Sequence, residues 1–250
     1  MPLISIITPT QAHNADHIAT VWDCLVGQTL PAGWEFEWLV QEDGSSRTVR
    51  DLLPRDDRVC HDALGIQIGS AACRNHALAR AKGDIIAGMD HDDFYEPGGL
   101  ARLLQPLIDR AGARHHIDWS CGRSQLLMED GTTWTKEDVL PPGLVEARSV
   151  TDHYLATNDF PFPAAFTAFR RQQLIAHGGW PAVARSADAI LLASFSDEHH
   201  GWWVADTVAV YRRWARQKTV QPGDFAIRDL PHVRGMIGQR RAAQDLVDAT

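Results

Sequence analysis

The stretch Ile85-Ile86-Ala87-Gly88-Met89-Asp90-His91-Asp92-Asp93 decides the fold, because a strand-length apolar run ends there in a cluster of acids. Apolar runs of this length are typical of buried strands. Neighbouring carboxylates repel one another, and a hard cation such as Mg²⁺ or Mn²⁺, which takes oxygen ligands, offsets that repulsion. Aspartate is also common in turns, so an acidic turn without any ligand explains the same residues. Both interpretations stay open at this point.

Strand and helix signals alternate along the first hundred residues. Strands are expected at residues 3–8, 36–40, 58–60 and 85–89, and helices at 18–25, after Ser45, from Ser70 to Gly83, and from Pro97. Ser45 and Ser70 are the expected N-caps. This alternation predicts an α/β fold with a mostly parallel, Rossmann-like sheet and helices on both faces.

The second half is patterned differently. Glu129-Asp130-Gly131 predicts a hairpin between residues 117–128 and 132–136. Further strands are expected at 164–169 and 203–211, and helices at 170–176 and 184–194. We expect one domain over residues 1–222, with halves 1–110 and 111–222, and a helical tail over 223–250.

Composition limits the function classes. The chain has 250 residues and a net charge of −8, which argues against a nucleic-acid binder held by a basic face. The four cysteines (24, 60, 73 and 121) form no CxxC pair, so no zinc or redox motif is visible. No signal peptide and no apolar run of membrane-spanning length is found, so we expect no transmembrane segment and a cytoplasmic location.

Polar residues follow three of the four strands expected in the first half: Pro9-Thr10, Glu42-Asp43-Gly44-Ser45 and Asp90 to Asp93. Because parallel strands present their carboxyl ends at one sheet edge, we expect these residues around a single crevice. Carboxylates, a bound cation and helix N-termini together suit a nucleoside diphosphate.

These segments resemble the family-2 glycosyltransferases, which have the GT-A fold. The matching segments are residues 4–10, 42–45, 69–79 and 83–93, and their order and spacing are those of the family. Each segment alone is weak evidence, whereas four in order are specific. The resemblance is firm over residues 3–110 and looser to about residue 220.

The resemblance implies a donor-binding role for several residues of the first half. Pro9 and Thr10 would border the base pocket, and Asp43 would accept a hydrogen bond from the pyrimidine edge. Arg74 would lie near the base or the diphosphate, and Asp90 would contact the ribose. In the DXD motif Asp90-His91-Asp92, Asp92 would bind the divalent metal, Mn²⁺ or Mg²⁺.

The resemblance also implies a catalytic base and a phosphate-binding arginine in the second half. After the break at residues 178–181, Asp188 is the candidate base, and Ala187 stands where the family has a first acid. Arg212 would face the donor phosphates. Trp214 stands where some members have a histidine that binds metal, and Gln11 stands in place of a family tyrosine.

Alternative roles remain for several of these residues. Asp188 could be a helix-capping or solvated acid. His91 is expected to point away from its neighbouring acids. Trp180, Trp202 and Trp203 are expected in the core, although acceptor stacking is the alternative.

The function implied is metal-dependent, inverting transfer of a sugar from a nucleotide-diphosphate donor, a UDP-sugar, to a hydroxyl or amine of a small-molecule, glycan or glycolipid acceptor. One rival is a nucleotidyltransferase, although residues 9–17 lack the Gly, Lys or Arg of a triphosphate-binding loop. The other is a non-catalytic module that binds nucleotide or glycan, which Ala187 leaves open.

Overall fold

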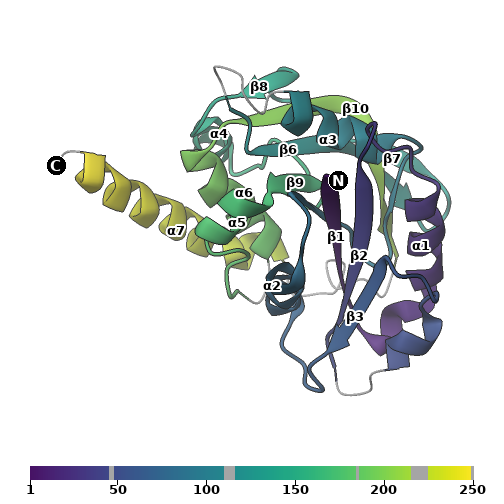
Figure 1. Cartoon of the computed structure of the whole chain (residues 1–250). Helices are drawn as coiled ribbons and strands as arrows, with labels where there is room; N and C mark the ends of the chain where they lie inside the picture. Colours follow the sequence, from purple (N-terminus) through teal and green to yellow (C-terminus); the bar gives the residue numbers. More distant parts are fainter. Residues whose placement is uncertain (45–47, 110–115, 184–185, 215–224, 249–250) are drawn as a thin grey trace.

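The computed structural model describes residues 1–44, 48–109, 116–183, 186–214 and 225–248. Its centre is a ten-stranded sheet in the order β3-β2-β1-β4-β9-β6-β10-β5, with β7 on β6 and β8 on β10 (Figure 1). The strands are β1 (Leu3–Thr10), β2 (Glu35–Glu42), β3 (Val59–Ala63), β4 (Ile85–Gly88), β5 (Phe94–Tyr95), β6 (Trp119–Met128), β7 (Thr133–Thr135), β8 (Gly143–Val145), β9 (Thr167–Arg170) and β10 (Gly201–Arg213). The helices are α1 (Ile18–Val26), α2 (Ser70–Arg80), α3 (Gly99–Asp109), α4 (Ser149–Thr157), α5 (Arg171–Ala176), α6 (Ala187–Glu198) and α7 (Phe225–Asp248), and short 3₁₀ helices span Ala12–His17 and Thr48–Leu52.

The first four strands, β1 to β4, are parallel, as the sequence predicts, whereas the short β5 pairs antiparallel with β10. β1 pairs in parallel with both β2 and β4, and Thr10 lies opposite Glu42. Alternate residues of these strands enter two separate cores: Ile6 and Trp38 pack with α1 and α3, whereas Ile7 and Leu39 pack with α2 and α6. Figure 1 shows α1 and α2 on opposite faces of the sheet. The carboxyl ends of β1, β2 and β4 therefore meet at one edge.

The carboxyl-terminal half makes the sheet mixed. β9 runs antiparallel to β4 and β6, and β10 runs parallel to β6. The predicted hairpin is present as the antiparallel pair β6 and β7. Because β9 bridges β4 and β6, the ends of β4 and β10 belong to one continuous sheet.

Pro9 does not end the first strand, contrary to the prediction. The Thr10 carbonyl accepts from Asp43 N in β2, whereas the Ile7 carbonyl accepts from Met89 N beyond β4. Odd-numbered residues of β1 therefore turn their backbone groups toward β4, and the β4 pairing stops opposite Ile7. Proline has no N–H to donate, and at this position none is needed.

The start and end of α2 also differ from the prediction. Ser70 is the first helical residue rather than the cap, and Gly69 precedes it with φ of 85°. The helix ends at Arg80, before Gly83. A Cβ at Gly83 would lie 2.5 Å from the Ser5 backbone nitrogen, so glycine here permits close packing against β1. The Ser45 cap lies outside the described residues, and the helix expected after it is the 3₁₀ turn Thr48–Leu52.

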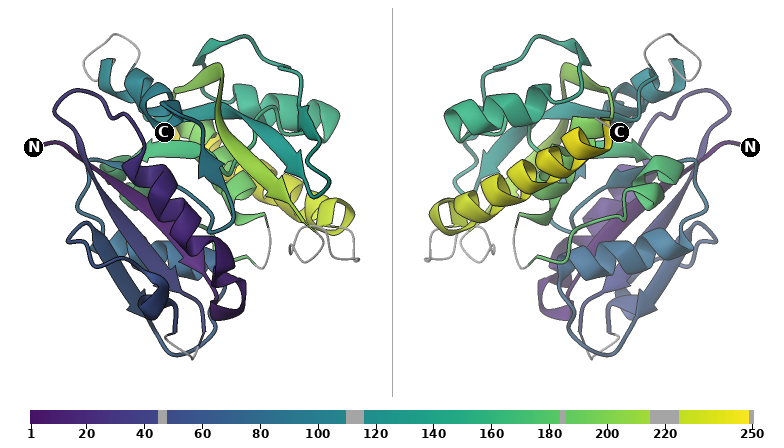
Figure 2. Two further views of the ribbon diagram at one scale, coloured as in Figure 1. Left: turned by 90° about the vertical axis from the view of Figure 1, so that its right-hand side faces the viewer. Right: turned by 90° about the vertical axis from the view of Figure 1, so that its left-hand side faces the viewer.

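The tail expected from residue 223 contains α7. Its Val233 and Ile237 pack on Tyr154 of α4 and Ile190 of α6. In Figure 1 the far end of α7 projects beyond the other elements, and Figure 2 shows the helix crossing one side of the molecule. Within the described ranges, no helix combines the length and apolarity needed to cross a membrane.

We predict that Gly201→Ala destabilises the chain, because a Cβ there would lie 1.9 Å from the ring of the fully buried Trp119. Overpacking of this kind costs about 1–3 kcal/mol. Gly235→Ala in α7 is the matched control, since its Cβ meets nothing within 4 Å, and in a helix the change should stabilise by about 0.5–1 kcal/mol. Urea denaturation measures both variants. Equal midpoints for the two variants would contradict the packing described for β10.

Candidate functional site

Asp43 is buried at the end of β2, and both of its oxygens are bonded. Oδ1 accepts from the backbone nitrogens of Ile68 (2.6 Å) and Gly69 (3.0 Å), and Oδ2 accepts from Gln11 Nε2 (2.9 Å). The carboxylate therefore occupies the N-terminus of α2, where the helix dipole favours a negative charge. Asp43 thus supplies the N-terminal interaction that the sequence attributed to Ser70, and it fixes the loop that begins this side of the site.

The end of β1 lies beside Asp43. Pro9 and Thr10 are both buried, and Thr10 Oγ1 has no hydrogen-bond partner in the described part of the chain. Buried hydroxyls are normally satisfied. An unsatisfied one at this edge is a group that a bound ligand could engage.

Arg74 joins the two halves of the site. Its Nη2 donates to Asp90 Oδ1 (2.6 Å), after β4, and lies 3.4 Å from Asp188 Oδ2, in α6. Burial by itself lowers the pKa of this guanidinium, but the charges of Asp188 and Asp90 outweigh that effect and raise it. The preceding residue, Cys73, adjoins Asp43: burial and the Asp43 charge raise the pKa of its thiol to about 12. One turn of α2 therefore links three of the predicted site residues.

Asp188 lies in the first turn of α6, and 30% of its side chain is exposed. Its Oδ1 accepts from the Trp180 indole Nε1 (2.8 Å). The pKa of this carboxyl is raised, chiefly by burial and further by the charge of Asp90. The charge of Arg74 and the hydrogen bond from Trp180 act in the opposite direction but do not outweigh burial. Ala187, by contrast, is buried in the core with Leu191. The acid missing at position 187 is thus replaced by apolar packing, while Asp188 remains at the site.

Asp92 and Asp93 are both buried and are held by the end of β10. Asp92 Oδ2 accepts from Trp214 Nε1 (2.8 Å), and Asp93 Oδ1 accepts from the Arg212 backbone nitrogen (2.9 Å). Asp93 Oδ2 is buried without a partner in the described part of the chain. Burial, followed by the charges of Asp92 and Asp90, raises the pKa of Asp93 well above its usual range. Arg212 is placed over the Phe94 ring (5.1 Å), with Nη1 3.2 Å from His17 Nδ1.

The donor set at the acidic turn suits a divalent cation that ligates substrate phosphates as well as protein. No group of three His, Cys, Asp or Glu side chains in the described ranges could hold a metal ion by itself. Arg74 engages one oxygen of Asp90, the Arg212 backbone nitrogen one oxygen of Asp93, and Trp214 one oxygen of Asp92, so each acid keeps a second oxygen outside these bonds. Asp92 is the acid to which the family resemblance assigns the metal. Mg²⁺ is commonly bound by one or two carboxylates together with waters and substrate phosphates. The residues present fit that mode.

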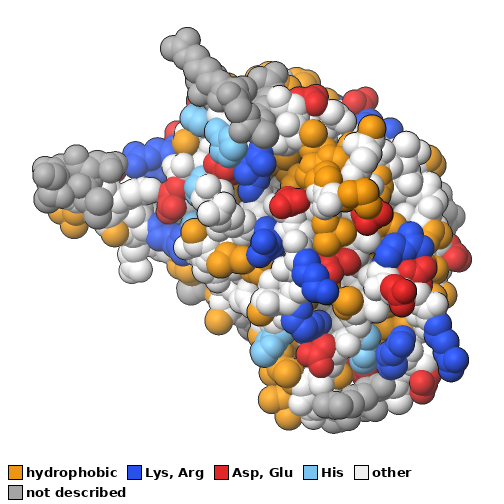
Figure 3. Space-filling model, in the orientation of Figure 1, with side chains coloured by type: hydrophobic (Ala, Val, Ile, Leu, Met, Phe, Trp, Pro, Cys, Tyr) orange, Lys and Arg blue, Asp and Glu red, His pale blue; other side chains and the backbone are white. Residues whose placement is uncertain are grey.

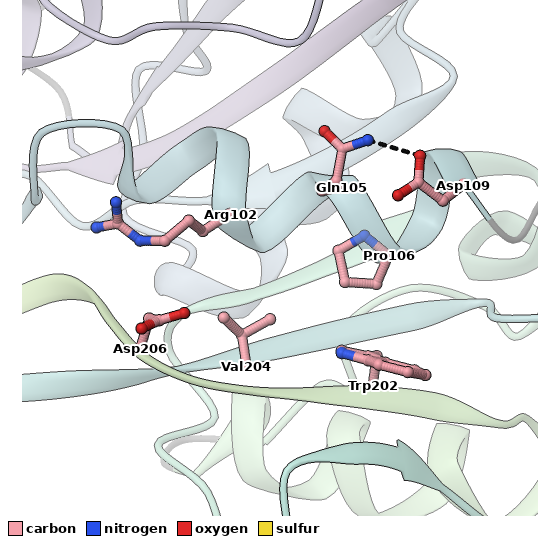
Figure 4. Close-up of a pocket in the computed structure, with 7 residues that line it drawn as sticks. All are labelled: Arg102, Gln105, Pro106, Asp109, Trp202, Val204 and Asp206. Atoms are coloured by element: carbon pink, nitrogen blue, oxygen red, sulfur yellow. Dashed lines mark hydrogen bonds between the residues drawn. The ribbon is translucent and has the colours of Figure 1, made fainter.

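The remaining aromatic and histidine side chains named from the sequence lie either in the core or beside a hollow next to β10. Trp180 and Trp203 are buried, and Trp203 stacks on Phe162 (4.5 Å), as the core interpretation predicts. His91 Nε2 is buried and has no partner in the described ranges. Trp202 instead lines a hollow of about 520 Å³ between α3 and β10 (Figure 4). Its lining residues are Arg102, Gln105, Pro106, Asp109, Trp202, Val204 and Asp206. The hollow lies along the first half of β10. Arg212 and Trp214 lie at the opposite end of this strand, so the hollow is separate from the acidic turn.

Sequence reasoning missed four residues that hold the site in place: Gln11, Asn75, Trp180 and Trp214. Each was visible only as a departure from a motif or as a neighbour of one. Their contacts join segments up to 122 positions apart, as between Trp214 and Asp92. Figure 3 shows that acidic and basic side chains are interspersed on the face seen in Figure 1, without a broad basic field.

Residues 5–174 match the sequence profile described as Glycosyl transferase family 2. The chain belongs to this family. A similar curated protein is the putative teichuronic acid biosynthesis glycosyltransferase TuaG of Bacillus subtilis, 31% identical over 140 residues, which are 54% of this chain and 52% of that protein. An uncharacterized glycosyltransferase of Haemophilus influenzae is 30% identical over 117 residues, 43% of each chain. This family-2 chain thus aligns with about half the length of these relatives.

Solved structures confirm the GT-A fold of this family-2 chain. Staphylococcus aureus TarS 1–349 in complex with UDP-GlcNAc superimposes with a TM-score of 0.68 at 17% identity, over 96% of this chain and 66% of that one. The complex of the same protein with UDP gives a TM-score of 0.66 at 16% identity, over 95% and 65%.

Proposed function

We propose that this chain transfers a sugar from a nucleotide-diphosphate donor, a UDP-sugar, to a hydroxyl or amine acceptor, with inversion and with Mn²⁺ or Mg²⁺. The observation that carries the proposal is the bridge made by Arg74, whose Nη2 reaches both Asp90 and Asp188. This bridge connects the C-terminal ends of the parallel strands with the start of α6. Asp90, which would bind the donor, and Asp188, the candidate base, both contact the Arg74 guanidinium.

The donor side would be formed by the ends of β1, β2 and β4. The unsatisfied Thr10 hydroxyl, Pro9 and Asp43 would border the base, and Asp90 would bind the ribose. Arg212 would face the phosphates. A UDP donor is favoured because UDP and UDP-GlcNAc are bound by TarS, whose fold is shared.

A divalent cation held by Asp92 would offset the charge that develops on the departing nucleoside diphosphate. The chain's own residues would supply the proton transfer. As the acceptor oxygen or nitrogen forms its bond to the anomeric carbon, Asp188 would take the proton from that atom. The bond from the anomeric carbon to the diphosphate oxygen breaks with its electron pair on the diphosphate. Attack from the face opposite the leaving group inverts the configuration.

Release of nucleoside diphosphate tests this proposal. The purified chain would be incubated with Mn²⁺ and UDP-, GDP- or dTDP-sugars, with and without small-molecule, glycan and glycolipid acceptors. We expect release from UDP-sugars to exceed release from the others and to rise when an acceptor is present. Absence of release from every donor with every acceptor would count against catalysis and favour a binding module.

Asp43→Asn is predicted to raise the donor KM about 10- to 100-fold, since a hydrogen bond to a charged group is worth about 1.5–3 kcal/mol. The amide oxygen can still accept from the Ile68 and Gly69 nitrogens, so α2 should remain anchored. kcat should change little, because the hydrogen bond that Asp43 would accept from the base is present in both the ground state and the transition state. Asp62→Asn in β3 is the matched control, because this side chain is 44% exposed and pairs with Arg80, at the opposite end of α2 from Asp43. An unchanged donor KM in Asp43→Asn would remove Asp43 from the donor site.

A further inference from the structure

We propose that Trp180 and Asn75 are positioning residues for Asp188: Asn75 fixes the backbone of Trp180, and the Trp180 indole N–H fixes the carboxylate. This inference rests on the proposed function, in which Asp188 takes the acceptor proton. Neither residue is assigned a role by the motifs.

The indole of Trp180 is a rigid donor. It is 4% exposed and packs in the core formed with α2 and α6, so the ring has no room to turn away from the site. Its Nε1 lies 2.8 Å from Asp188 Oδ1. Buried Trp N–H groups normally find a partner, and here the partner is the candidate base.

Asn75 holds Trp180 through both ends of its amide. Its Nδ2 donates to the Trp180 carbonyl (2.8 Å), and its Oδ1 accepts from the Trp180 backbone nitrogen (2.8 Å). The loop approaches Asn75 so closely that a Cβ at Gly179 would lie 2.4 Å from Asn75 Oδ1. Gly178 and Gly179 also have φ of 93° and 71°, which favour glycine. The glycine pair therefore allows this attachment.

Two adjacent residues of α2 thus control the two oxygens of one carboxylate. Asn75 acts on Oδ1 through Trp180, whereas Arg74 Nη2 faces Oδ2 at 3.4 Å. That distance is long for a hydrogen bond, so Oδ2 keeps its capacity to accept a proton. The neutral indole orients the carboxylate without adding a charge to the site.

The charged groups that face Asp188 are Arg74 from α2 and Asp90 from the end of β4. The Trp180 bond lowers the Asp188 pKa against the effect of burial. A base must be deprotonated to act, so activity should rise as pH increases through its pKa. Loss of the indole N–H raises that pKa, and the acid limb of the rate profile should move to higher pH.

Trp180→Phe tests the role, because it keeps a buried ring and removes the N–H. The matched control is Trp203→Phe: Trp203 is buried in the same core, and its Nε1 has no partner in the described part of the chain. We expect Trp180→Phe to lower kcat about 10- to 100-fold, as small misplacements of catalytic groups do, with donor KM within about twofold. The acid limb of its pH–rate profile should move to higher pH. Asn75→Ala should likewise lower kcat and move the acid limb to higher pH. Trp203→Phe should leave both unchanged.

Equal kcat values and equal acid limbs in Trp180→Phe and Trp203→Phe would overturn the positioning role while leaving the proposed function intact. Full activity in Asp188→Asn would instead overturn the base assignment. A second measurement needs no turnover: NMR titration of the Asp188 carboxyl, assigned with Asp188→Asn, should give a higher pKa in Trp180→Phe than in the wild type. An unchanged pKa would overturn the proposal even if Trp180→Phe loses activity through partial unfolding.

Discussion

Asp188→Asn is expected to lower sugar transfer about 10²- to 10⁴-fold, the usual contribution of a positioned general base. Asparagine has the same shape and can still accept from Trp180 Nε1, but its amide cannot take the acceptor proton. Because the proposed donor site is formed by other residues, donor affinity should stay within about twofold. The measurement is the rate of nucleoside diphosphate release with acceptor, beside calorimetry with the nucleotide.

Asp206→Asn is the control for this experiment, because Asp206 is exposed on the first half of β10, beside the hollow of Figure 4. Its transfer rate should equal that of the wild type. Full transfer by Asp188→Asn would remove this residue from the mechanism. If the wild type binds nucleotide but transfers sugar to no acceptor, the chain is a non-catalytic binding module. Ala187, in place of an acid of the family, is the sequence feature that favours this alternative.

Removal of the divalent cation is expected to have an effect of similar size. A metal that stabilises the leaving charge contributes several kcal/mol, and each 1.36 kcal/mol is a factor of ten in rate. Treatment with EDTA should therefore lower transfer about 10²-fold or more, and Mn²⁺ should restore it. In Asp92→Asn the amide can still accept from Trp214 Nε1, but the carboxylate ligand is lost, so Mn²⁺ should restore little.

Asp130→Asn, in the exposed turn between β6 and β7, is the control for Asp92→Asn. It should respond to EDTA and Mn²⁺ as the wild type does. Full transfer after exhaustive chelation would contradict the metal proposal. If Mn²⁺ restores Asp92→Asn as fully as Asp130→Asn, other groups must hold the cation.

The parallel half of the fold followed from the sequence because local signals were enough there. Apolar runs that end in Pro9-Thr10, Asp43 and Asp90 belong to adjacent parallel strands, and parallel pairing brings their ends together. The helices expected at residues 18–25 and from Pro97 are likewise present as α1 and α3. For these residues the sheet follows from patterns only a few residues long.

The rest of the site depends on contacts between distant segments. Asn75 and Trp180 are 105 positions apart, and no local pattern pairs them. β5 and β8 have two and three residues, too short to show a period of two. α4 was missed because its nine residues, with polar Thr151 buried, lack a clear apolar stripe. Ser70 was wrongly predicted as the N-cap because the anion at the start of α2 is Asp43, which follows β2 and is distant in sequence.

Stabilisation by nucleotides tests the central claim most directly. The melting temperature would be measured with UMP, UDP, GDP, dTDP and ADP, each with and without Mn²⁺. A ligand that binds only the folded state stabilises it by mass action, by about 2.7 kcal/mol at one hundred times its Kd. We predict that UDP with Mn²⁺ raises the melting temperature most, and that Asp43→Asn and Asp92→Asn both reduce the shift. No shift with any nucleotide in either condition would contradict a donor site at the ends of β1, β2 and β4.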